Sequence, residues 1–354
     1  MADIADLYKG TGISKDQLSD DGEPCILYGE LYTKYKSETI KEVISKTNID
    51  NTKLVRSKAN DVIIPCSGET AEDIATARCV LNDNILLGGD LNIIRLHGYD
   101  GTFMSYQLNG KRKYDIAKVA QGVSVVHLYG EHLKGVKTIN PCLEEQKKIA
   151  SLLALLDERI ATQNKIIDKL QSLIKGLRVH LVKIEKGHIV HLNEIASIYQ
   201  PQTISSTELT EDGYWVYGAN GIIGKYKDYN HKTEQICITC RGNTCGMVNY
   251  TKPMSWITGN AMVINTDEHQ DNVCKRYLFH YLSAYNFNRI ISGSGQPQIV
   301  RTPLEQLKIT LPSILEQEQK AMLLDKIQTK IEISNSVLKL YQKQKQYLLR
   351  QMFI

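Results

Sequence analysis

The sequence contains one long internal repeat. Pro141 opens the run Pro-Cys-Leu-Glu-Glu-Gln, and Pro312 opens the similar run Pro-Ser-Ile-Leu-Glu-Gln. Nearer the start of each half, residues 3–8 (Asp-Ile-Ala-Asp-Leu-Tyr) resemble residues 194–199 (Glu-Ile-Ala-Ser-Ile-Tyr). The repeating unit is far longer than the roughly 20–50 residues of solenoid repeats. The repeat therefore predicts a duplicated, domain-sized design with pseudo-two-fold symmetry. A duplication that only enlarges the protein is the alternative, but the blocks between the similar endings diverge.

Each copy ends in a long amphipathic helix. The apolar positions advance by alternating steps of three and four, which is the 3.5-residue period of a coiled coil. About 40 uninterrupted residues would form a helix of ~60 Å. We expect the two helices to bury their seams as an intramolecular antiparallel coiled coil; self-association of chains is the alternative. The first seam is Ile149, Leu153, Leu156, Ile160, Gln163, Ile167, Leu170, Ile174, Leu177, Leu181 and Ile184, and the second is Leu324, Ile327, Ile331, Ser334, Leu338, Tyr341, Lys345, Leu348 and Met352.

The blocks before the helices are rich in short β-branched runs. Turn residues bound these runs, among them Gly88-Gly89, Asn109-Gly110 and Asn220-Gly221. A short helix is expected around residues 273–285. The predicted fold class is α+β, with two strand-rich globular domains, each followed by a long helix. The predicted boundaries are 1–142, 143–187, 188–312 and 313–354. The runs taken as strands are residues 62–64, 92–95, 235–239 and 261–264.

Composition narrows the class of protein. The net charge of +4 is compatible with a polyanionic partner without requiring one. No apolar run approaches the ~20 residues that span a bilayer, so no membrane association is expected. The chain opens without the pattern of a signal peptide, which predicts a cytoplasmic location where the eight cysteines stay reduced.

Four sequence elements, in this order, resemble the specificity subunits of type I restriction–modification systems. They are the two Pro-x-x-x-Glu-Gln lead-ins, the Leu-Asn-Glu-Ile-Ala run from Leu192, the run from Cys240 to Gly246, and the loop from Gly293 to Gln298. The resemblance covers nearly the whole chain. It implies that the blocks are target-recognition domains, each reading one half of a split DNA sequence, while the helices set the gap.

The resemblance also implies the partners. These are double-stranded DNA, two methyltransferase (modification) subunits docked on the helices, and two ATP-dependent restriction/translocase subunits. S-adenosylmethionine, ATP and Mg are then expected on those partners. No cofactor, metal or catalytic residue is expected in this chain.

The second block supplies the clearer candidates for DNA contact. Arginine pairs in bidentate fashion with guanine or phosphate, and glutamine pairs with adenine, while glycine lets the backbone approach. For each position a solvated surface charge or a turn-capping group is the alternative. The candidates are Arg241, Asn243, Thr244, Gln296, Gln298, Arg301, Lys225, Tyr226 and Lys227.

The first block departs from this pattern. It has Pro-Cys-Ser-Gly-Glu-Thr at residues 65–70, without an arginine, and residues 122–127 lack the Gly-Gln-Pro-Gln form. Glutamate can accept a hydrogen bond from cytosine, and a basic cluster can contact phosphates. The candidates here are Ser67, Glu69, Thr70, Lys111, Arg112, Lys113 and His127.

Two sequence patterns that could suggest an enzyme or a metal site are incomplete. Cys237-x-x-Cys240 has no second pair to complete a zinc site, and the two side chains would point to opposite faces of a strand. The glycines from Gly218 to Gly224 are spaced unlike a phosphate-binding loop, and Tyr226 replaces its Ser or Thr. A DNA-reading scaffold is therefore favoured over a coiled-coil protein-binding adaptor and over a stand-alone DNA-modifying enzyme.

Overall fold

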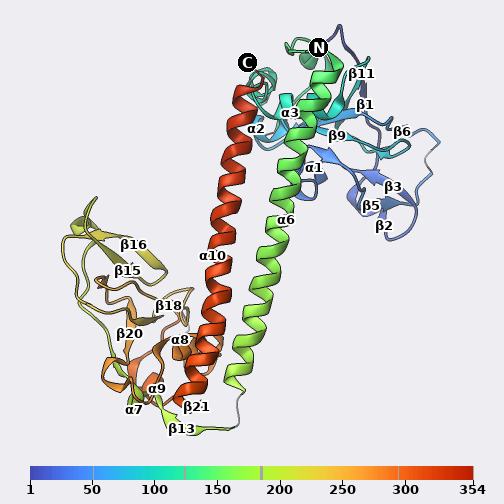
Figure 1. Cartoon of the computed structure of the whole chain (residues 1–354). Helices are drawn as coiled ribbons and strands as arrows, with labels where there is room; N and C mark the ends of the chain where they lie inside the picture. The colour runs from blue at the N-terminus through green and yellow to red at the C-terminus, as the bar shows by residue number, and fades with distance from the viewer. Residues whose placement is uncertain (51, 123–124, 184–185, 294, 354) are drawn as a thin grey trace. The chain divides into compact units, whose positions relative to one another are not determined.

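The computed structural model describes residues 1–50, 52–122, 125–183, 186–293 and 295–353 (Figure 1). The chain forms two compact units. Unit 1 combines the described residues of 1–164 with those from 336 onward, and unit 2 is formed by residues 165–335. Each unit contains one strand-rich domain, here called domain 1 and domain 2, together with part of each long helix.

Domain 1 is built on two five-stranded sheets. The central strand β7 (Asp61–Pro65) contains the apolar run Val62-Ile-Ile64 and is wholly buried, as expected for the middle of a core. The first sheet has the order β1 (Ala5–Lys9), β11 (Leu91–Leu96), β7, β9 (Arg78–Val80) and β4 (Thr39–Ile40). The second has the order β2 (Leu18–Ser19), β5 (Ser45–Thr47), β3 (Glu23–Ile26), β10 (Leu86–Leu87) and β6 (Val55–Arg56).

Short helices complete domain 1. Asp100 caps the longest of them, because its carboxylate accepts a hydrogen bond from the Phe103 amide at 2.7 Å. The pair Asn109-Gly110 was predicted to turn between strands. That prediction was wrong, because Gly110 ends helix α3 and another helix follows within the described chain. The helices are α1 (Glu30–Thr33), α2 (Ala71–Ile74), α3 (Gly101–Asn109), α4 (Lys113–Val119) and α5 (Gly130–Lys134).

Domain 2 repeats part of this plan. Its four-stranded sheet has the order β14 (Ser197–Tyr199), β20 (Ala261–Asn265), β17 (Ile236–Thr239) and β18 (Val248–Tyr250), so β14, β20 and β17 correspond to β1, β11 and β7. A three-stranded sheet contains β16 (Gly221–Tyr226), β15 (Tyr214–Gly218) and β19 (Trp256–Ile257). Strands β13 (His188–His191) and β21 (Lys308–Leu311) pair with one another, and the helices are α7 (Leu192–Ile195), α8 (Lys275–Ala284) and α9 (Arg301–Glu305). These elements confirm the predicted duplication, strands and helix.

The two long helices are α6 (Leu143–Val182) and α10 (Ile314–Gln351). In unit 1, Ala150 and Leu153 of α6 pack with Leu348 near the end of α10. In unit 2, Ile174 and Leu181 of α6 pack with residues nearer the start of α10, including Leu324. The helices are therefore antiparallel within each unit, and the predicted seam positions are buried or half-buried. Ile184 lies outside the described residues.

The glutamine that ends each lead-in motif fixes its long helix to the neighbouring domain. Gln146 and Gln317 are each only 1% exposed. The Gln146 side chain accepts a hydrogen bond from the Asp100 amide, which begins α3, at 2.9 Å. The Gln317 side chain accepts one from the Cys274 amide, which begins α8, also at 2.9 Å. In each half, the motif thus ties the long helix to the start of a short helix of the neighbouring domain, and the two short helices, α3 and α8, correspond.

Candidate nucleic-acid interface

In domain 2, two loops predicted to contact DNA are joined by a short antiparallel bridge. Arg241 lies opposite Gln298, and Gln298 in turn pairs with Ser292. The Ile299 amide donates to the Cys240 carbonyl at 3.0 Å, and the Gly242 amide donates to the Pro297 carbonyl at 2.9 Å. We call residues 240–242 together with the described residues of 292–299 the domain 2 bridge.

Domain 1 contains the same construction at the matching repeat positions. Strands β8 (Ser67–Gly68) and β12 (Val126–His127) pair so that Ser67 lies opposite His127. His127 also pairs with Gln121, and the Leu128 amide donates to the Cys66 carbonyl at 2.8 Å. We call residues 66–68 together with the described residues of 121–128 the domain 1 bridge. Ser67 therefore corresponds to Arg241, and His127 corresponds to Gln298.

A glycine with positive φ shapes the turn of each bridge. Gly122 has φ of 121° and Gly293 has φ of 95°, a region that favours glycine. A Cβ at Gly122 would collide with the Val125 carbonyl, and one at Gly293 would collide with the Gln296 carbonyl. The two glycines thus meet the same backbone requirement, and Val125 corresponds to Gln296.

The domain 2 bridge presents most of its predicted residues to solvent. Arg241, Asn243, Gln296 and Gln298 are exposed, whereas the Thr244 hydroxyl is hydrogen-bonded to the Asn220 side chain. Within the described part of the chain, no hydrogen bond or ion pair holds the side chains of Arg241, Gln296 or Gln298. Their donors and acceptors are therefore available to a ligand.

The remaining domain 2 candidates lie on other elements. Arg301, at the start of α9, is tied to Glu305 at 2.6 Å. Lys225 and Tyr226 end strand β16, and Lys227 follows it. The turn of the β15–β16 hairpin nevertheless contacts the bridge region, because Thr239 and Asn249 both donate to the Ala219 carbonyl.

Two residues of this hairpin region were missed by sequence reasoning. Trp215 lies opposite Lys225, whose ammonium nitrogen is 5.4 Å from the indole centroid. The Lys252 ammonium nitrogen is 5.3 Å from the same centroid. A register shift between Val216 and Tyr217 brings Trp215 opposite Lys225. This irregularity could not be predicted from the sequence, because a β-bulge inserts an extra residue without a characteristic residue pattern. We call Trp215, Lys225 and Lys252 the Trp215 cluster.

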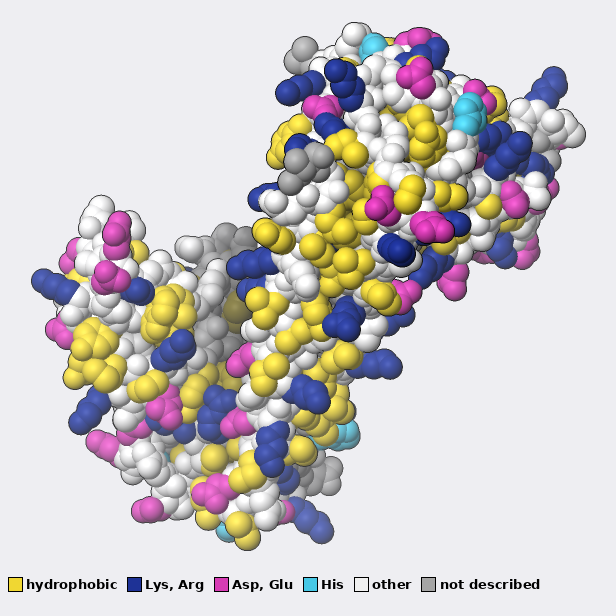
Figure 2. Space-filling model, turned by 45° about the horizontal axis from the view of Figure 1, so that its top comes forward, with side chains coloured by type: hydrophobic (Ala, Val, Ile, Leu, Met, Phe, Trp, Pro, Cys, Tyr) yellow, Lys and Arg dark blue, Asp and Glu magenta, His cyan; other side chains and the backbone are white. Residues whose placement is uncertain are grey.

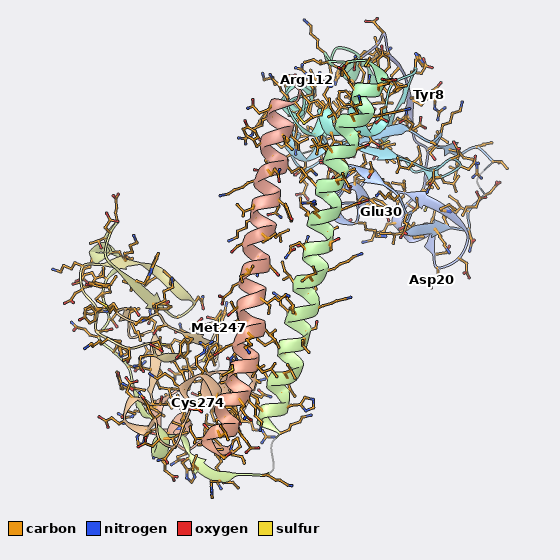
Figure 3. The ribbon with its side chains drawn as sticks, viewed as in Figure 1. Tyr8, Asp20, Glu30, Arg112, Met247 and Cys274 are labelled. Carbon is orange, nitrogen blue, oxygen red and sulfur yellow. The ribbon has the colours of Figure 1, made fainter. Side chains whose placement is uncertain are left out.

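In domain 1 the candidates separate into two places. Ser67 is nearly buried at 9% exposure, while Glu69 is exposed; Thr70 uses its hydroxyl to cap α2 by accepting from the Asp73 amide. Lys111, Arg112 and Lys113 lie at the α3–α4 turn, away from the bridge strands in the fold, and Figure 3 shows Arg112 beside the C-terminal part of α10. Arg112 is paired with Asp115 at 3.2 Å.

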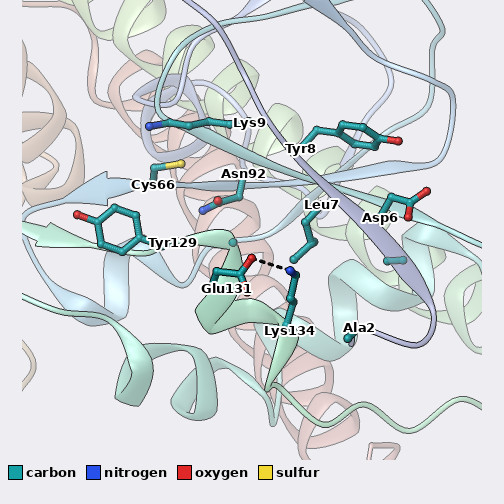
Figure 4. Close-up of a pocket in the computed structure, with 12 residues that line it drawn as sticks. Ala2, Asp6, Leu7, Tyr8, Lys9, Cys66, Asn92, Tyr129, Glu131 and Lys134 are labelled. Atoms are coloured by element: carbon teal, nitrogen blue, oxygen red, sulfur yellow. Dashed lines mark hydrogen bonds and ion pairs between the residues drawn. The ribbon is translucent and has the colours of Figure 1, made fainter.

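A cleft of about 680 Å³ adjoins the domain 1 bridge (Figure 4). Tyr129, which lines the cleft, stacks on His127 with ring centroids 6.1 Å apart. Lys9 and Lys134 also line it, although Lys134 is paired with Glu131 at 2.6 Å. Burial raises the pKa of the Cys66 thiol in this cleft to about 11, so the thiol is protonated at neutral pH and is a poor nucleophile. The cleft thus combines aromatic and basic groups and suits binding better than covalent chemistry.

The Cys237 and Cys240 side chains lie on opposite sides of the domain 2 sheet, as predicted. Cys237 packs with Tyr217 and Val263, whereas Cys240 belongs to the core that contains Ile238. Among the described residues, no group of three His, Cys, Asp or Glu side chains is arranged to hold a metal ion. In that same part of the chain, no helix is long and apolar enough to cross a membrane.

Comparisons with known proteins point to one family. A family model described as "Type I restriction modification DNA specificity domain" matches residues 1–172 and again residues 185–340. The chain is 32% identical over 151 residues to the type I restriction enzyme EcoprrI specificity subunit of Escherichia coli, covering 41% of this chain but only 36% of that protein. It is 26% identical to the MjaVIII specificity subunit of Methanocaldococcus jannaschii, covering 93% of this chain and 86% of that protein.

Solved structures share the fold. The S subunit of a type I restriction–modification system from M. genitalium matches with a TM-score of 0.74 and 17% identity, covering 100% of this chain and 94% of that chain. A chain from a study of complex assembly and conformational transition in the type I system matches with a TM-score of 0.55 and 15% identity, covering 98% and 95%. Since the family model matches each half of the duplication, this chain belongs to the type I restriction modification DNA specificity family.

Proposed function

We propose that this chain is the DNA-sequence-reading subunit of a type I restriction–modification complex. Domain 1 reads one half of a split target and domain 2 reads the other. The observation that carries the proposal is the pair of bridges, which share a backbone frame but present different side chains. A common frame with variable side chains suits two readers of different half-sites, because base edges are distinguished by side-chain chemistry.

The long helices have a second role in this proposal. They set the gap between the half-sites and dock two methyltransferase subunits, which two restriction/translocase subunits then join. Each helix leaves large apolar side chains exposed outside its seam, visible as yellow patches in Figure 2. Exposed apolar patches of this kind are typical of protein interfaces. These residues include Leu152, Leu155, Ile166 and Leu173 on α6, and Met322, Leu323, Ile333, Leu340 and Tyr347 on α10.

The chemistry in this proposal belongs to the partners. S-adenosylmethionine, ATP and Mg are held by the modification and restriction subunits, and this chain selects the DNA sequence on which they act. The exchangeable reading modules are residues 1–142 and 188–312. They are joined by the helical segments 143–187 and 313–354.

A methylation map tests the proposal. The chain is expressed with the methyltransferase encoded beside it, in a host that lacks other DNA methylation, and modified bases are sequenced. Methylated adenines in a split motif with a fixed gap are expected. A soluble complex of the two proteins that leaves the DNA unmethylated and binds no DNA would instead favour a protein-binding adaptor.

A further inference from the structure

The two bridges differ in the side chains at three corresponding positions. Resting on the proposed function, we propose that these positions form the base-reading triplet of each domain. In domain 2 the triplet Arg241, Gln296 and Gln298 selects guanine and adjacent adenine. In domain 1 the triplet Ser67, Val125 and His127 lacks the arginine contact and favours thymine. The two half-sites therefore differ because of these three positions.

The frames of the two triplets are matched by their hydrogen bonds. His127 and Gln121 exchange two backbone hydrogen bonds, of 2.7 and 2.9 Å. Gln298 and Ser292 exchange two of 2.8 Å. Since Gly122 and Gly293 also both have positive φ, the paired backbone of each bridge brings its triplet to the same place in its domain. Side-chain identity is then the main variable.

The domain 2 triplet is free to read purines. Gln296 lies in the bend just before Gln298, and both side chains are exposed. Arg241 is the cross-strand neighbour of Gln298. The guanidinium fits O6 and N7 of guanine, and a glutamine amide fits N6 and N7 of adenine. By contrast, Arg276 and Arg301 of the same domain are already paired with Asp325 and Glu305.

The domain 1 triplet offers different chemistry. Ser67 is short and nearly buried, so it cannot extend to a base as Arg241 can. Val125 is 51% exposed, which is unusual for a valine and provides an apolar surface for the methyl group of thymine. The His127 ring is exposed and is stacked on Tyr129, which limits its reach and orients its nitrogens.

The test is a methylation map of the Arg241→Ser, Gln298→His double variant, expressed with its methyltransferase. Both side chains are exposed, so the fold should tolerate the change. We expect one half-site to lose its guanine requirement and to weaken its adenine requirement, since Gln296 is kept, with selectivity there falling roughly ten- to one-hundredfold. The other half-site and the gap should stay unchanged. The matched control is Arg350→Ser with Gln306→His, which alters exposed residues outside the bridges and should leave the motif intact.

A reciprocal variant tests domain 1. Val125→Gln with His127→Gln should change only the half-site that the first variant leaves untouched. Because complete loss of methylation would hide the motif, each complex is also used to select DNA from a random pool. An unchanged motif in both variants, with normal methylation by the wild type, overturns the triplets but leaves the proposed function standing. A wild-type complex that neither methylates nor selects DNA overturns the proposed function itself.

Discussion

The two halves attach their domains to the long helices at similar places but with opposite charge. In unit 1, the Lys345 ammonium of α10 lies 2.6 Å from a carboxylate oxygen of Glu38 and 2.6 Å from one of Asp157. In unit 2, the carboxylate of Asp325 on α10 accepts hydrogen bonds from Arg276 and His280 of α8. A lysine between two carboxylates in one half thus has its counterpart in a carboxylate held by an arginine and a histidine.

This difference shows which contacts a duplication keeps and which it changes. The lead-in glutamines bind backbone amides, and backbone amides are present whatever the side chains are, so this contact is the same in both halves. The charged clusters depend on side-chain pairs, and a buried charge is stable only with its own partner. Each domain is therefore fitted to its own helix segments. Single substitutions can measure the stability that comes from contacts present in both halves and from contacts present in only one.

The largest effect is expected for Lys345→Met. The substitution leaves the carboxylates of Glu38 and Asp157 together without their cation, and both side chains are largely buried. Removing one partner of a buried ion pair costs about 3–5 kcal/mol. Urea unfolding of the whole chain measures the loss. Lys343→Met, an exposed neighbour on α10, is the control and should change stability by less than about 0.5 kcal/mol. Equal effects from both would show that the buried cluster contributes little.

The glutamine contact should matter equally in the two halves. Gln146→Leu and Gln317→Leu each remove side-chain hydrogen bonds and leave a helix-start amide without its acceptor. An unsatisfied buried donor costs about 1–3 kcal/mol. Similar losses of unfolding free energy are expected, with exposed Gln319→Leu as the neutral control. A loss confined to one half would contradict the shared role of the motif.

Replacing two buried tyrosines by phenylalanine should change the free energy of unfolding differently in the two domains. Tyr106 of α3 and Tyr277 of α8 lie in corresponding helices of the two domains, and both are fully buried. The Tyr106 hydroxyl donates to Asp157 at 2.6 Å, whereas the Tyr277 hydroxyl has no partner within the described chain. Tyr106→Phe should cost about 1.5–3 kcal/mol, because the acceptor is charged, while Tyr277→Phe should be neutral or stabilising. Thermal unfolding measures both, and a comparable loss from Tyr277→Phe would reveal a partner for its hydroxyl.

Acidification should weaken unit 2 through His280. Burial lowers the pKa of His280, assisted by the charges of Arg178 and Arg276 and opposed by its hydrogen bond to Asp325. Arg178 donates to its Nδ1, so the neutral ring donates from Nε2 to Asp325. Because the unfolded chain binds this proton more readily, stability falls as pH drops below about 6.5, by at most ~1.4 kcal/mol per pH unit.

Urea unfolding at pH 7.5 and 5.5 tests this dependence. Burial would raise the pKa of Asp325, but hydrogen bonds from His280 and Arg276 lower it to about 2, so this carboxylate stays ionised throughout the range. Burial also lowers the pKa of His231, which adds a change of the same sign. His280→Gln should therefore reduce the pH dependence without abolishing it. A wild-type slope equal to that of the variant would contradict the assignment.

The sequence predicted the repeating parts of the molecule well. The heptad seams and the central strands follow from periodicity, which is a local signal, and the duplication follows from similar residues in the two halves. The partners of Lys345 were not predictable, because Glu38 is brought to it from the opposite end of the chain. The pairing of Ser67 with His127 was also hidden, since strands as short as β8 and β12 leave no periodic pattern.

The smallest effect is expected at the Trp215 cluster of domain 2. Lys225, which also lies 3.5 Å from Asp212, and Lys252 place two ammonium groups beside one indole, where both would attract a bound phosphate. Lys225→Ala with Lys252→Ala should weaken DNA binding by the complex at low salt and reduce the slope of log affinity against log salt by about 1–2. The recognised motif should stay the same, because phosphate contacts carry no sequence information. The control is Lys308→Ala, which changes an exposed lysine of the same unit. If the double variant altered the recognised motif, the Trp215 cluster would instead belong to the base-reading groups.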